Sequence, residues 1–591
     1  MKIAARFASA FVALLFILTS AMGQTPQDAS ILLSHPGFEY LKTDLKNVLD
    51  LTLPAEQEQW ANIEGYIDTL SEGVDGKRPV YVNVVTGTKP NALLIWAPLT
   101  DKNFKSFREN LESLGYTVTR DNKDTNLYQV EQEDTEYGFA RVIPASGYCG
   151  LVLTSEQKDD DGKKGDKGPS KEEAVAVLKD LITRSTPPSS AIEGNMIAEL
   201  SNSDDSEAGQ KHRREAYAEV RRTSMDVIKK RPEESSTEFE LRRLAVEQQL
   251  DEGERMLAEL SKVTATLKLD AADSASLKSA LVLAAKPIAG SSLDTATKQF
   301  GTQPDIFGSI GKEQGSALSV RVNHPIDPMR QKNAAAFLDA VQKDVEARTV
   351  ASKERSESEK AAINKSTAGV LNVLRASIKA GWANGFVESI PDGKGEFYSI
   401  AAFAAPAAAD LNSVLPDLAG AARGNVVEMN IDKQGDVAIH RVVMAEGVSD
   451  LFDRVFGVNK DIFVGVSASQ IWIASGLDAK ERLKKTIAGI GAPVSSDCPV
   501  HVEVNLLPII QRLDDIAKTD APGKTPEEQE GQRSRARTRA RAIAAMKDGG
   551  DQAVMKFKVA NGEITGEITL ETGVLRWIGK MMSAFSAENF E

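Results

Sequence analysis

Two histidines that stand before proline are the first residues in this chain whose type and setting could do chemistry. His35 lies in "SILLSHPGFEYLKTDL" and His324 lies in "ALSVRVNHPIDPMRQKNAAAFL". Each follows a short apolar stretch and leads into a helical pattern. The pair could be one catalytic or metal site, or it could mark a duplication. Neither histidine has an Asp, Glu or Cys nearby at ligand spacing, which favours a structural turn over catalysis.

The other motifs of catalysis and metal binding do not occur. The remaining histidines, His212, His440 and His501, form no H-x-x-x-H, H-E-x-x-H or H-x-x-E-H arrangement. The chain contains no G-x-S-x-G elbow, no P-loop and no G-x-G-x-x-G after a strand. We therefore predict no catalytic residue, no cofactor-binding residue and no metal ligand. A site assembled from distant residues would leave no local motif.

An acidic loop could suggest calcium, but its spacing is wrong. In "EQKDDDGKKGDKGPSKEE", Gly162 as the invariant glycine of an EF-hand would place Gln157 first and Gly168 twelfth. Those positions need Asp and Glu. The aspartates are also diluted by lysines. The loop is therefore interpreted as a flexible charged linker.

Two further features have open alternatives. Cys149 and Cys498 could form a disulfide in an oxidising compartment, or they could be two buried thiols. The run "RSRARTRARAIAAMK" could bind an acidic partner or an anionic polymer, or it could be a solvated face balanced by the glutamates of 527–530. Its alternating arginines are Arg533, Arg535, Arg537, Arg539 and Arg541.

The two His-Pro stretches belong to a larger set of strand ends. Ser34, Ser201, Asn323 and Asn505 each end a short strand-like run before a helical segment. We expect these side chains to cap the following helices, because Ser and Asn accept hydrogen bonds from a first helical turn. Each segment is followed by a hairpin pattern and a closing helix. Three closing helices should end at glycine, namely at Gly115, Gly301 and Gly420.

The order of these elements suggests a duplication. Extra strand-rich units at 116–182 and 425–490 lie between the first and second starts and between the third and fourth. The chain would then consist of two similar halves, 25–305 and 315–591. The alternative is chance, because strand-helix units with Ser or Asn at the helix start are common.

Helical insertions interrupt both halves. A hairpin is expected at 203–261, with a break at Arg231-Pro232, and further insertions at 328–380 and 526–547. Their polar faces are dense in Glu, Lys and Arg. They could be arms that hold a partner, as in helical chaperones and adaptors, or hairpins packed along the body.

The first 23 residues have the pattern of a secretory signal peptide. Lys2 and Arg6 precede an apolar core, and small residues precede a cut before Gln24. We therefore expect a periplasmic or extracellular protein with no membrane span after signal removal. The full chain has a net charge of −14, which disfavours nucleic acid as a partner.

Together these features predict an α+β protein of two similar halves. Each half should contain mostly antiparallel sheet with ββα units and inserted helical hairpins, with helices on one face. The leading hypothesis is a non-enzymatic binding, scaffolding or chaperone-like protein of the cell envelope, with a protein or an envelope polymer as partner and no cofactor. The alternative is an envelope hydrolase. The sequence sets neither the ligand nor the oligomeric state.

Overall fold

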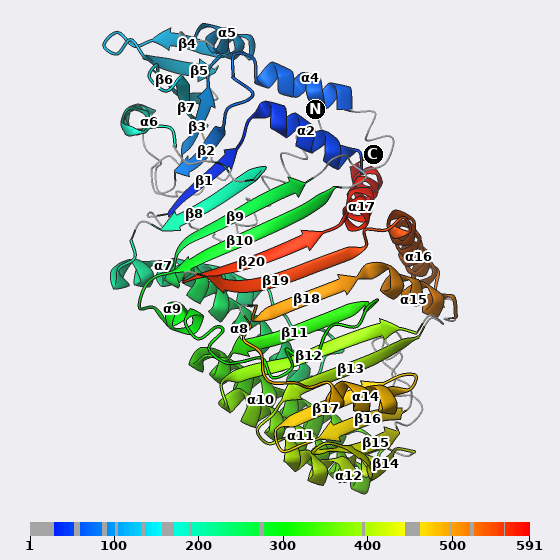
Figure 1. The fold of residues 1–591 in the computed structure, drawn as a ribbon. Helices are drawn as coiled ribbons and strands as arrows, with labels where there is room; N and C mark the ends of the chain where they lie inside the picture. Colours follow the sequence, from blue (N-terminus) through cyan, green and yellow to red (C-terminus); the bar gives the residue numbers. More distant parts are fainter. Residues whose placement is uncertain are drawn as a thin grey trace. The chain divides into compact units, whose positions relative to one another are not determined.

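The computed structural model describes most of the 591-residue chain. The described residues are 29–51, 60–85, 92–100, 104–132, 136–155, 171–188, 192, 194–202, 204–270, 277–392, 396–422, 424–443, 461–496, 498–519, 525–560 and 562–590. The signal-peptide stretch and the core of the acidic loop lie outside them. The protein is of the α+β class, and all its described strand pairs within each unit are antiparallel (Figure 1).

The protein forms two compact units, and each unit is built from more than one segment of the sequence. Unit 1 comprises the residues up to 222 together with 254–288 and 578–591. Unit 2 comprises 223–253 and 289–577. The tip of the first helical insertion, at 223–253, therefore belongs with unit 2.

The strands of unit 1 form one antiparallel series. In the described residues, its order is β10-β9-β8-β1-β2-β3-β7-β6-β5-β4. The strands are β1 (Ala29–His35), β2 (Val80–Val85), β3 (Ala92–Pro98), β4 (Thr117–Arg120), β5 (Leu127–Gln132), β6 (Glu136–Ile143), β7 (Tyr148–Ser155), β8 (Met196–Asn202), β9 (Leu260–Asp270) and β10 (Lys278–Pro287).

The strands of unit 2 repeat this order. Their described order is β20-β19-β18-β11-β12-β13-β17-β16-β15-β14, so that β11 corresponds to β1 and each later strand to its counterpart. The strands are β11 (Leu318–Pro325), β12 (Trp382–Pro391), β13 (Phe397–Ala404), β14 (Val426–Gln434), β15 (Val437–Val443), β16 (Asp461–Val466), β17 (Gln470–Ser475), β18 (Val500–Asn505), β19 (Gln552–Ala560) and β20 (Glu563–Leu570).

The helices occupy matching places in the two strand series. Those that start among unit 1 residues are α2 (Phe38–Leu49), α4 (Trp60–Leu70), α5 (Lys105–Ser113), α6 (Lys171–Arg184) and α7 (Glu207–Asp226). The others are α8 (Ser236–Glu259), α9 (Ser292–Thr297), α10 (Pro328–Ala351), α11 (Glu357–Lys379), η1 (Ala408–Asp410), α12 (Leu411–Ala421), α14 (Ala479–Ala488), α15 (Leu506–Thr519), α16 (Pro526–Met546) and α17 (Thr572–Phe590).

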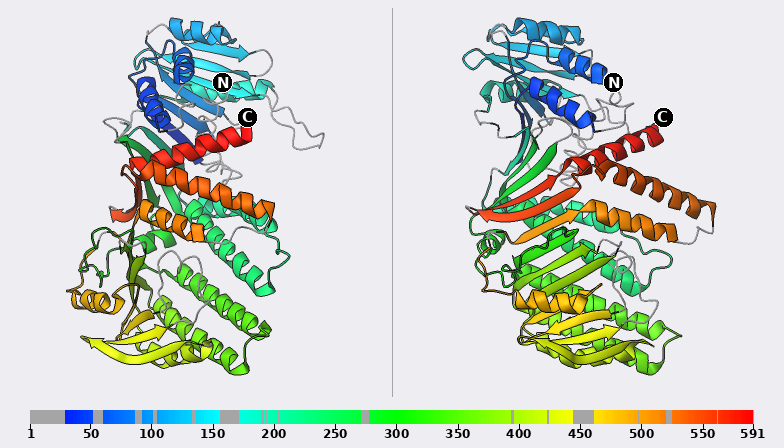
Figure 2. Two further views of the ribbon diagram at one scale, coloured as in Figure 1. Left: turned by 90° about the vertical axis from the view of Figure 1, so that its right-hand side faces the viewer. Right: turned by 45° about the vertical axis from the view of Figure 1, so that its right-hand side comes forward.

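The outer strands of each unit carry full hydrophobic cores on both faces. In unit 1, α6 packs on one face through Leu178 and Ile182, and α5 packs on the other through Phe107 and Leu111. In unit 2, α14 packs on one face, while α11 and α12 pack on the other (Figure 2). The expectation of helices on a single face is therefore wrong for these strands.

Three of the four predicted helix caps are also wrong. Ser201 lies inside β8, and the Ser206 hydroxyl accepts from the Gly209 N–H at the start of α7. The residue before α2 is Gly37, which makes no side-chain cap, and α10 is capped by Asp327 rather than Asn323. Ser34 and Asn323 are instead buried within their strands. α2 begins three residues after the end of β1, and α10 begins three residues after the end of β11.

The predicted stop at glycine holds in one case of three. Gly115 follows α5 with φ +92°, whereas α9 already ends at Thr297, four residues before Gly301. Gly420 lies inside α12, which continues to Ala421. The helical insertions have the expected break between α7 and α8, and a second break at Ser352–Ser356 separates α10 from α11.

Candidate binding surface

The central strands of unit 2 present a continuous apolar face, which we call floor 2. Cross-strand pairing aligns three rows over β11, β18, β19 and β20. The rows are Val322–Val500–Phe557–Gly566, Val320–Val502–Met555–Ile568 and Leu318–Val504–Ala553–Leu570. Alternation along each strand places these residues on one face. No charged or polar side chain interrupts the rows.

The central strands of unit 1 present an equivalent face, floor 1. Its rows cross β1, β8, β9 and β10 in the same way. They are Ile31–Leu200–Val263–Ala285, Leu33–Ala198–Ala265–Leu283 and, without a β1 member, Met196–Leu267–Leu281. The two units thus repeat this surface as well as the strand order.

Both floors are incompletely covered. The side chains of floor 2 are half-buried, and Gly566 is its single buried member. In floor 1 only Ile31 is buried, and Leu283 is 40% exposed. By contrast, Leu94 and Trp472 in the outer strands are 1% and 0% exposed. The floors are therefore apolar surfaces that the described helices flank without sealing.

The helical layer of unit 2 rises beside floor 2. Helices α15 and α16 form the insertion between β18 and β19, and their bases pack on Leu570 at the end of one floor row. From there the hairpin extends away from the sheet (Figure 2). The Arg576 guanidinium of α17 donates to the Ala545 carbonyl and fixes the end of α16.

The arginines of α16 divide into paired and unpaired groups. Arg539 pairs with Asp514 of α15 at 3.2 Å. Arg537 and Arg533 share one carboxylate, that of Glu530. Arg535 is exposed and Arg541 is half-buried, and neither has an ion-pair or hydrogen-bond partner among the described residues. The expectation of a face balanced by glutamate thus applies to part of the run.

The opposite face of the same strands is polar. One row crosses it as Arg321, His501, Lys556 and Glu567. Burial lowers the pKa of His501, and the neighbouring Lys556 lowers it further. Among described residues the His501 Nε2 has no hydrogen-bond partner.

A buried polar cluster holds the segment before β11 against this polar face in unit 2. The Asn323 Oδ1 accepts from the Asn384 Nδ2 at 2.9 Å and from the Trp382 Nε1 at 2.5 Å. The Asn323 Nδ2 donates to the Gln303 carbonyl, and Asn384 also donates to Asp305. These bonds explain why Asn323 is buried in a strand instead of capping a helix.

An ion-pair cluster lies next to it on β11 and β12. Arg321 donates to Glu388 at 3.0 Å and to the Phe307 carbonyl at 3.3 Å, and its guanidinium lies over Phe386. Burial raises the pKa of Glu388, although the Glu313 N–H and Arg321 oppose that shift. Each of these groups has a structural partner, so the cluster fastens the covering segment to the sheet.

The two histidines of the His-Pro stretches make unlike local contacts. In unit 1 the His35 Nδ1 accepts from the Gly37 N–H, and its Nε2 lies 3.8 Å from Asp44. In unit 2 His324 packs edge-on against Phe300 at 4.8 Å. Burial lowers the pKa of His324. Each histidine therefore has a partner close to its own turn.

A third histidine, His440, is fully buried beneath an edge strand. Its Nδ1 accepts from the Asn430 N–H at 3.0 Å, and its Nε2 has no partner among described residues. Asn430 has a left-handed φ of +54°, and the β14–β15 register shifts around it. Burial lowers the pKa of His440. Val130 is the corresponding residue of unit 1, so the histidine replaces an apolar side chain.

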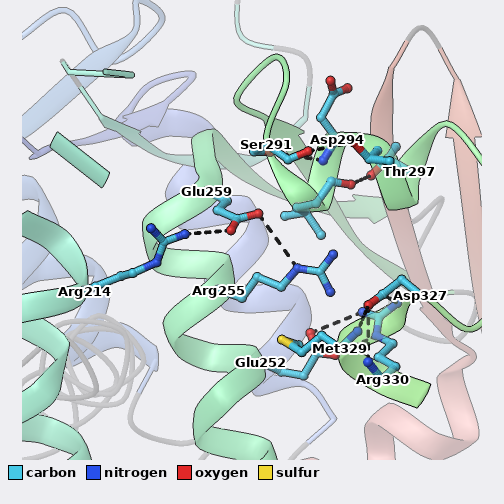
Figure 3. Close-up of polar contacts among 12 residues, drawn as sticks. Arg214, Glu252, Arg255, Glu259, Ser291, Asp294, Thr297, Asp327, Met329 and Arg330 are labelled. Carbon is cyan, nitrogen blue, oxygen red and sulfur yellow. Dashed lines mark hydrogen bonds and ion pairs between the residues drawn. The ribbon is translucent and has the colours of Figure 1, made fainter. Parts of the chain in front are cut away.

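The tip of the α7–α8 hairpin docks on α10 within unit 2, an interaction that we call the clasp. The Thr237 hydroxyl donates to buried Asp344 at 2.7 Å, and the Gln248 amide donates to the Asn333 carbonyl at 2.7 Å. Arg330 donates to Glu252 at 2.6 Å, beside the Asp327 cap of α10 (Figure 3). Arg348 also pairs with Asp344. This insertion is therefore packed, as one of the two expectations had it.

The other candidate residues stay apart from these surfaces. Cys149 is buried, Cys498 is half-buried, and both are free thiols. His212 lies exposed on α7. The described residues contain no group of three or more His, Cys, Asp or Glu side chains that could hold a metal ion. The Gly162 loop lies outside the described residues.

Comparison with known proteins yields no relative. No family model matches the chain, and no curated protein or solved structure matches it either. Within the described residues, every helix is too short or too polar to cross a bilayer.

Sequence patterns did contain a signal for the floors. The runs "LSVRVN", "VHVEVN" and "VMKFKVA" alternate apolar and polar residues, which is typical of strands with one apolar face. Alternation does not reveal whether a face is covered. Whether a face is covered depends on where the inserted helices pack relative to the sheet, and a local sequence pattern does not predict that placement.

Proposed function

We propose that this chain is a non-enzymatic binding protein of the cell envelope, scaffolding or chaperone-like in character, with the two floors as its working surfaces. One observation carries the proposal: twelve aligned positions of floor 2 and eleven of floor 1 are apolar, yet nearly all stay half-buried or exposed. Exposed contiguous apolar surface is characteristic of binding sites.

The repeated strand order supports a second part of the proposal. We infer that the two halves arose by internal duplication, because ten strands recur in the same order and pairing. Chance accounts poorly for a match of that length. Secretion to the periplasm or beyond remains an expectation from the first 23 residues.

The proposal is tested with a neutral apolar dye, N-phenyl-1-naphthylamine, whose fluorescence rises in apolar surroundings. We expect the wild-type chain to bind the dye, and Val502→Thr to weaken binding several-fold. Val502 lies at the centre of floor 2 between Val320 and Met555, and threonine preserves the β-branched shape while adding a hydroxyl.

The matched control is Val554→Thr. Val554 is half-buried on the neighbouring strand and pairs with Glu503, so it faces the polar side. It undergoes the same chemical change on the opposite face and should leave dye binding unchanged. Equal effects of the two substitutions, or no dye binding at all, would contradict the proposal.

The envelope hydrolase is kept as the second candidate because of Glu388. A buried carboxyl whose pKa is raised by desolvation is a recurrent feature of active sites. If that candidate were correct, Glu388→Gln would abolish hydrolysis of a substrate that the wild-type chain turns over, whereas Val502→Thr would not.

A further inference from the structure

We propose that floor 2 and the α15–α16 hairpin together bind a lipid with a phosphate headgroup. The acyl chain lies on the floor and the phosphate on Arg535 and Arg541 of α16, which have no partner among the described residues. This inference rests on the proposed function, since it names the ligand of one of the floors. It adds a charge requirement that the floor alone does not impose.

The size of the floor favours an acyl chain over a folded protein. Five residues along β11 and four strands across give a footprint of about 13 Å by about 14 Å at ordinary strand geometry. That area is on the order of 180 Å², well below the ~800 Å² per partner of a stable protein interface. A single extended hydrocarbon chain needs no larger surface.

The charge of the hairpin supplies the second half of the site. Between Gly531 and Lys547 the chain has five arginines and one lysine and no acidic residue, in a protein of net charge −14. Arg535 and Arg541 have no partner among the described residues, and Arg533 and Arg537 compete for Glu530 alone. One guanidinium group can donate two parallel hydrogen bonds to two oxygens of a phosphate, which makes arginine well suited to this headgroup.

The geometry connects the two parts. The hairpin leaves the sheet from the ends of β18 and β19, the two inner strands of floor 2. Buried Met546 marks the base of α16, and Arg541 and Arg535 precede it by about 8 Å and about 16 Å along the helix. An amphiphile with its chain on the floor would leave the apolar surface at the base of this hairpin, and Arg541 is the nearer of the two arginines to that base.

The test compares two monoacyl lipids that share one chain, 1-palmitoyl lysophosphatidic acid and 1-palmitoyl lysophosphatidylcholine. The full-length mature chain is titrated with each below its critical micelle concentration, by displacement of the neutral dye. We expect the anionic lipid to bind about tenfold more tightly, as is typical when charge-assisted hydrogen bonds are gained. That advantage should decrease as salt is added.

Arg535→Gln combined with Arg541→Gln should bring the anionic lipid to the affinity of the zwitterionic one and leave the latter unchanged. The control is Arg184→Gln with Arg222→Gln, two exposed arginines of α6 and α7 that undergo the same charge change. It should leave both affinities unchanged.

The outcomes separate this inference from the proposed function. Equal affinities for the two lipids in the wild type, with dye binding intact, overturn the lipid inference and leave the binding function standing. Weaker binding of the dye and of both lipids in Val502→Thr, together with a charge preference that depends on Arg535 and Arg541, supports the proposed function and the lipid inference together. An unfolded polypeptide that displaces the dye, where the anionic lipid does not, also overturns the lipid inference.

Discussion

Two buried polar side chains in strands, Asn323 and His440, fix the positions of neighbouring chain segments. Asn323 and His440 both occupy strand positions that could have been apolar, and Ser34 and Val130 stand at the corresponding places in the other half. Each of the two binds a backbone group of a neighbouring segment, the Gln303 carbonyl or the Asn430 N–H. They hold irregular chain segments against the sheet.

His440 predicts a dependence of stability on pH. Because burial lowers its pKa below the ordinary 6.5, the unfolded chain takes up a proton at a higher pH than the folded chain. The free energy of unfolding should therefore be highest above pH 6.5, where His440 is neutral in both states. It should fall as the pH drops from 6.5 toward the folded-state pKa. His324 and His501 shift in the same direction and add to the effect.

The measurement is urea unfolding at pH values from 8 to 5, on the wild type and on His440→Val. Valine is the residue of the matching position in unit 1. The variant should lose stability less steeply with acid, whatever its stability at pH 8. An identical slope in both chains would show that His440 does not contribute.

At the scale of elements, the two units share their strand order and differ mainly in the helices inserted between the strands. Short strand-like runs and hairpin patterns in the sequence predicted strands, and Pro232 with its neighbours predicted the break between α7 and α8. The partner of that hairpin could not be predicted, because Thr237 and Asp344 lie 107 residues apart with no pattern that links them. The floors share this difficulty, since their exposure depends on helix placement.

Asp344→Ala tests the clasp. Asp344 is fully buried, accepts from the Thr237 hydroxyl and pairs with Arg348, so its loss removes both of these contacts between α8 and α10 and within α10. We expect the free energy of unfolding of unit 2 to decrease by about 2 kcal/mol. Hydrogen exchange should rise over 236–253, since this part of α8 loses its anchor on α10.

Asp339→Ala is the control on the same helix. Asp339 is 60% exposed and pairs with Arg375, and exposed pairs of this kind contribute little. It should change neither stability nor exchange at 236–253. Unchanged exchange in Asp344→Ala would show that the hairpin tip is held by other contacts.

At the scale of the whole molecule, the division into two units means that unfolding need not be a single transition. The tip of one insertion belongs to unit 2 while its base belongs to unit 1, so α8 is shared between them. Cys149 and Cys498 lie in different units and provide separate reporters.

Thiol labelling follows the two units separately. Burial raises the pKa of the Cys149 thiol, and the side chain is fully buried, so it should not react until unit 1 opens. Half-buried Cys498 should react earlier. In denaturant without reductant, two thiols per chain should be titrated. A count of zero would mean that the two cysteines are joined in a disulfide.

The bulge at Asn430 has a consequence for association between molecules. In unit 2, β14 ends the described strand series, and its hydrogen-bond ladder is interrupted where Asn430 turns to meet His440. A regular edge strand would be a template on which a second chain could add itself. The Asn430 bulge, fixed by His440, therefore keeps this end of the described strand series from acting as such a template.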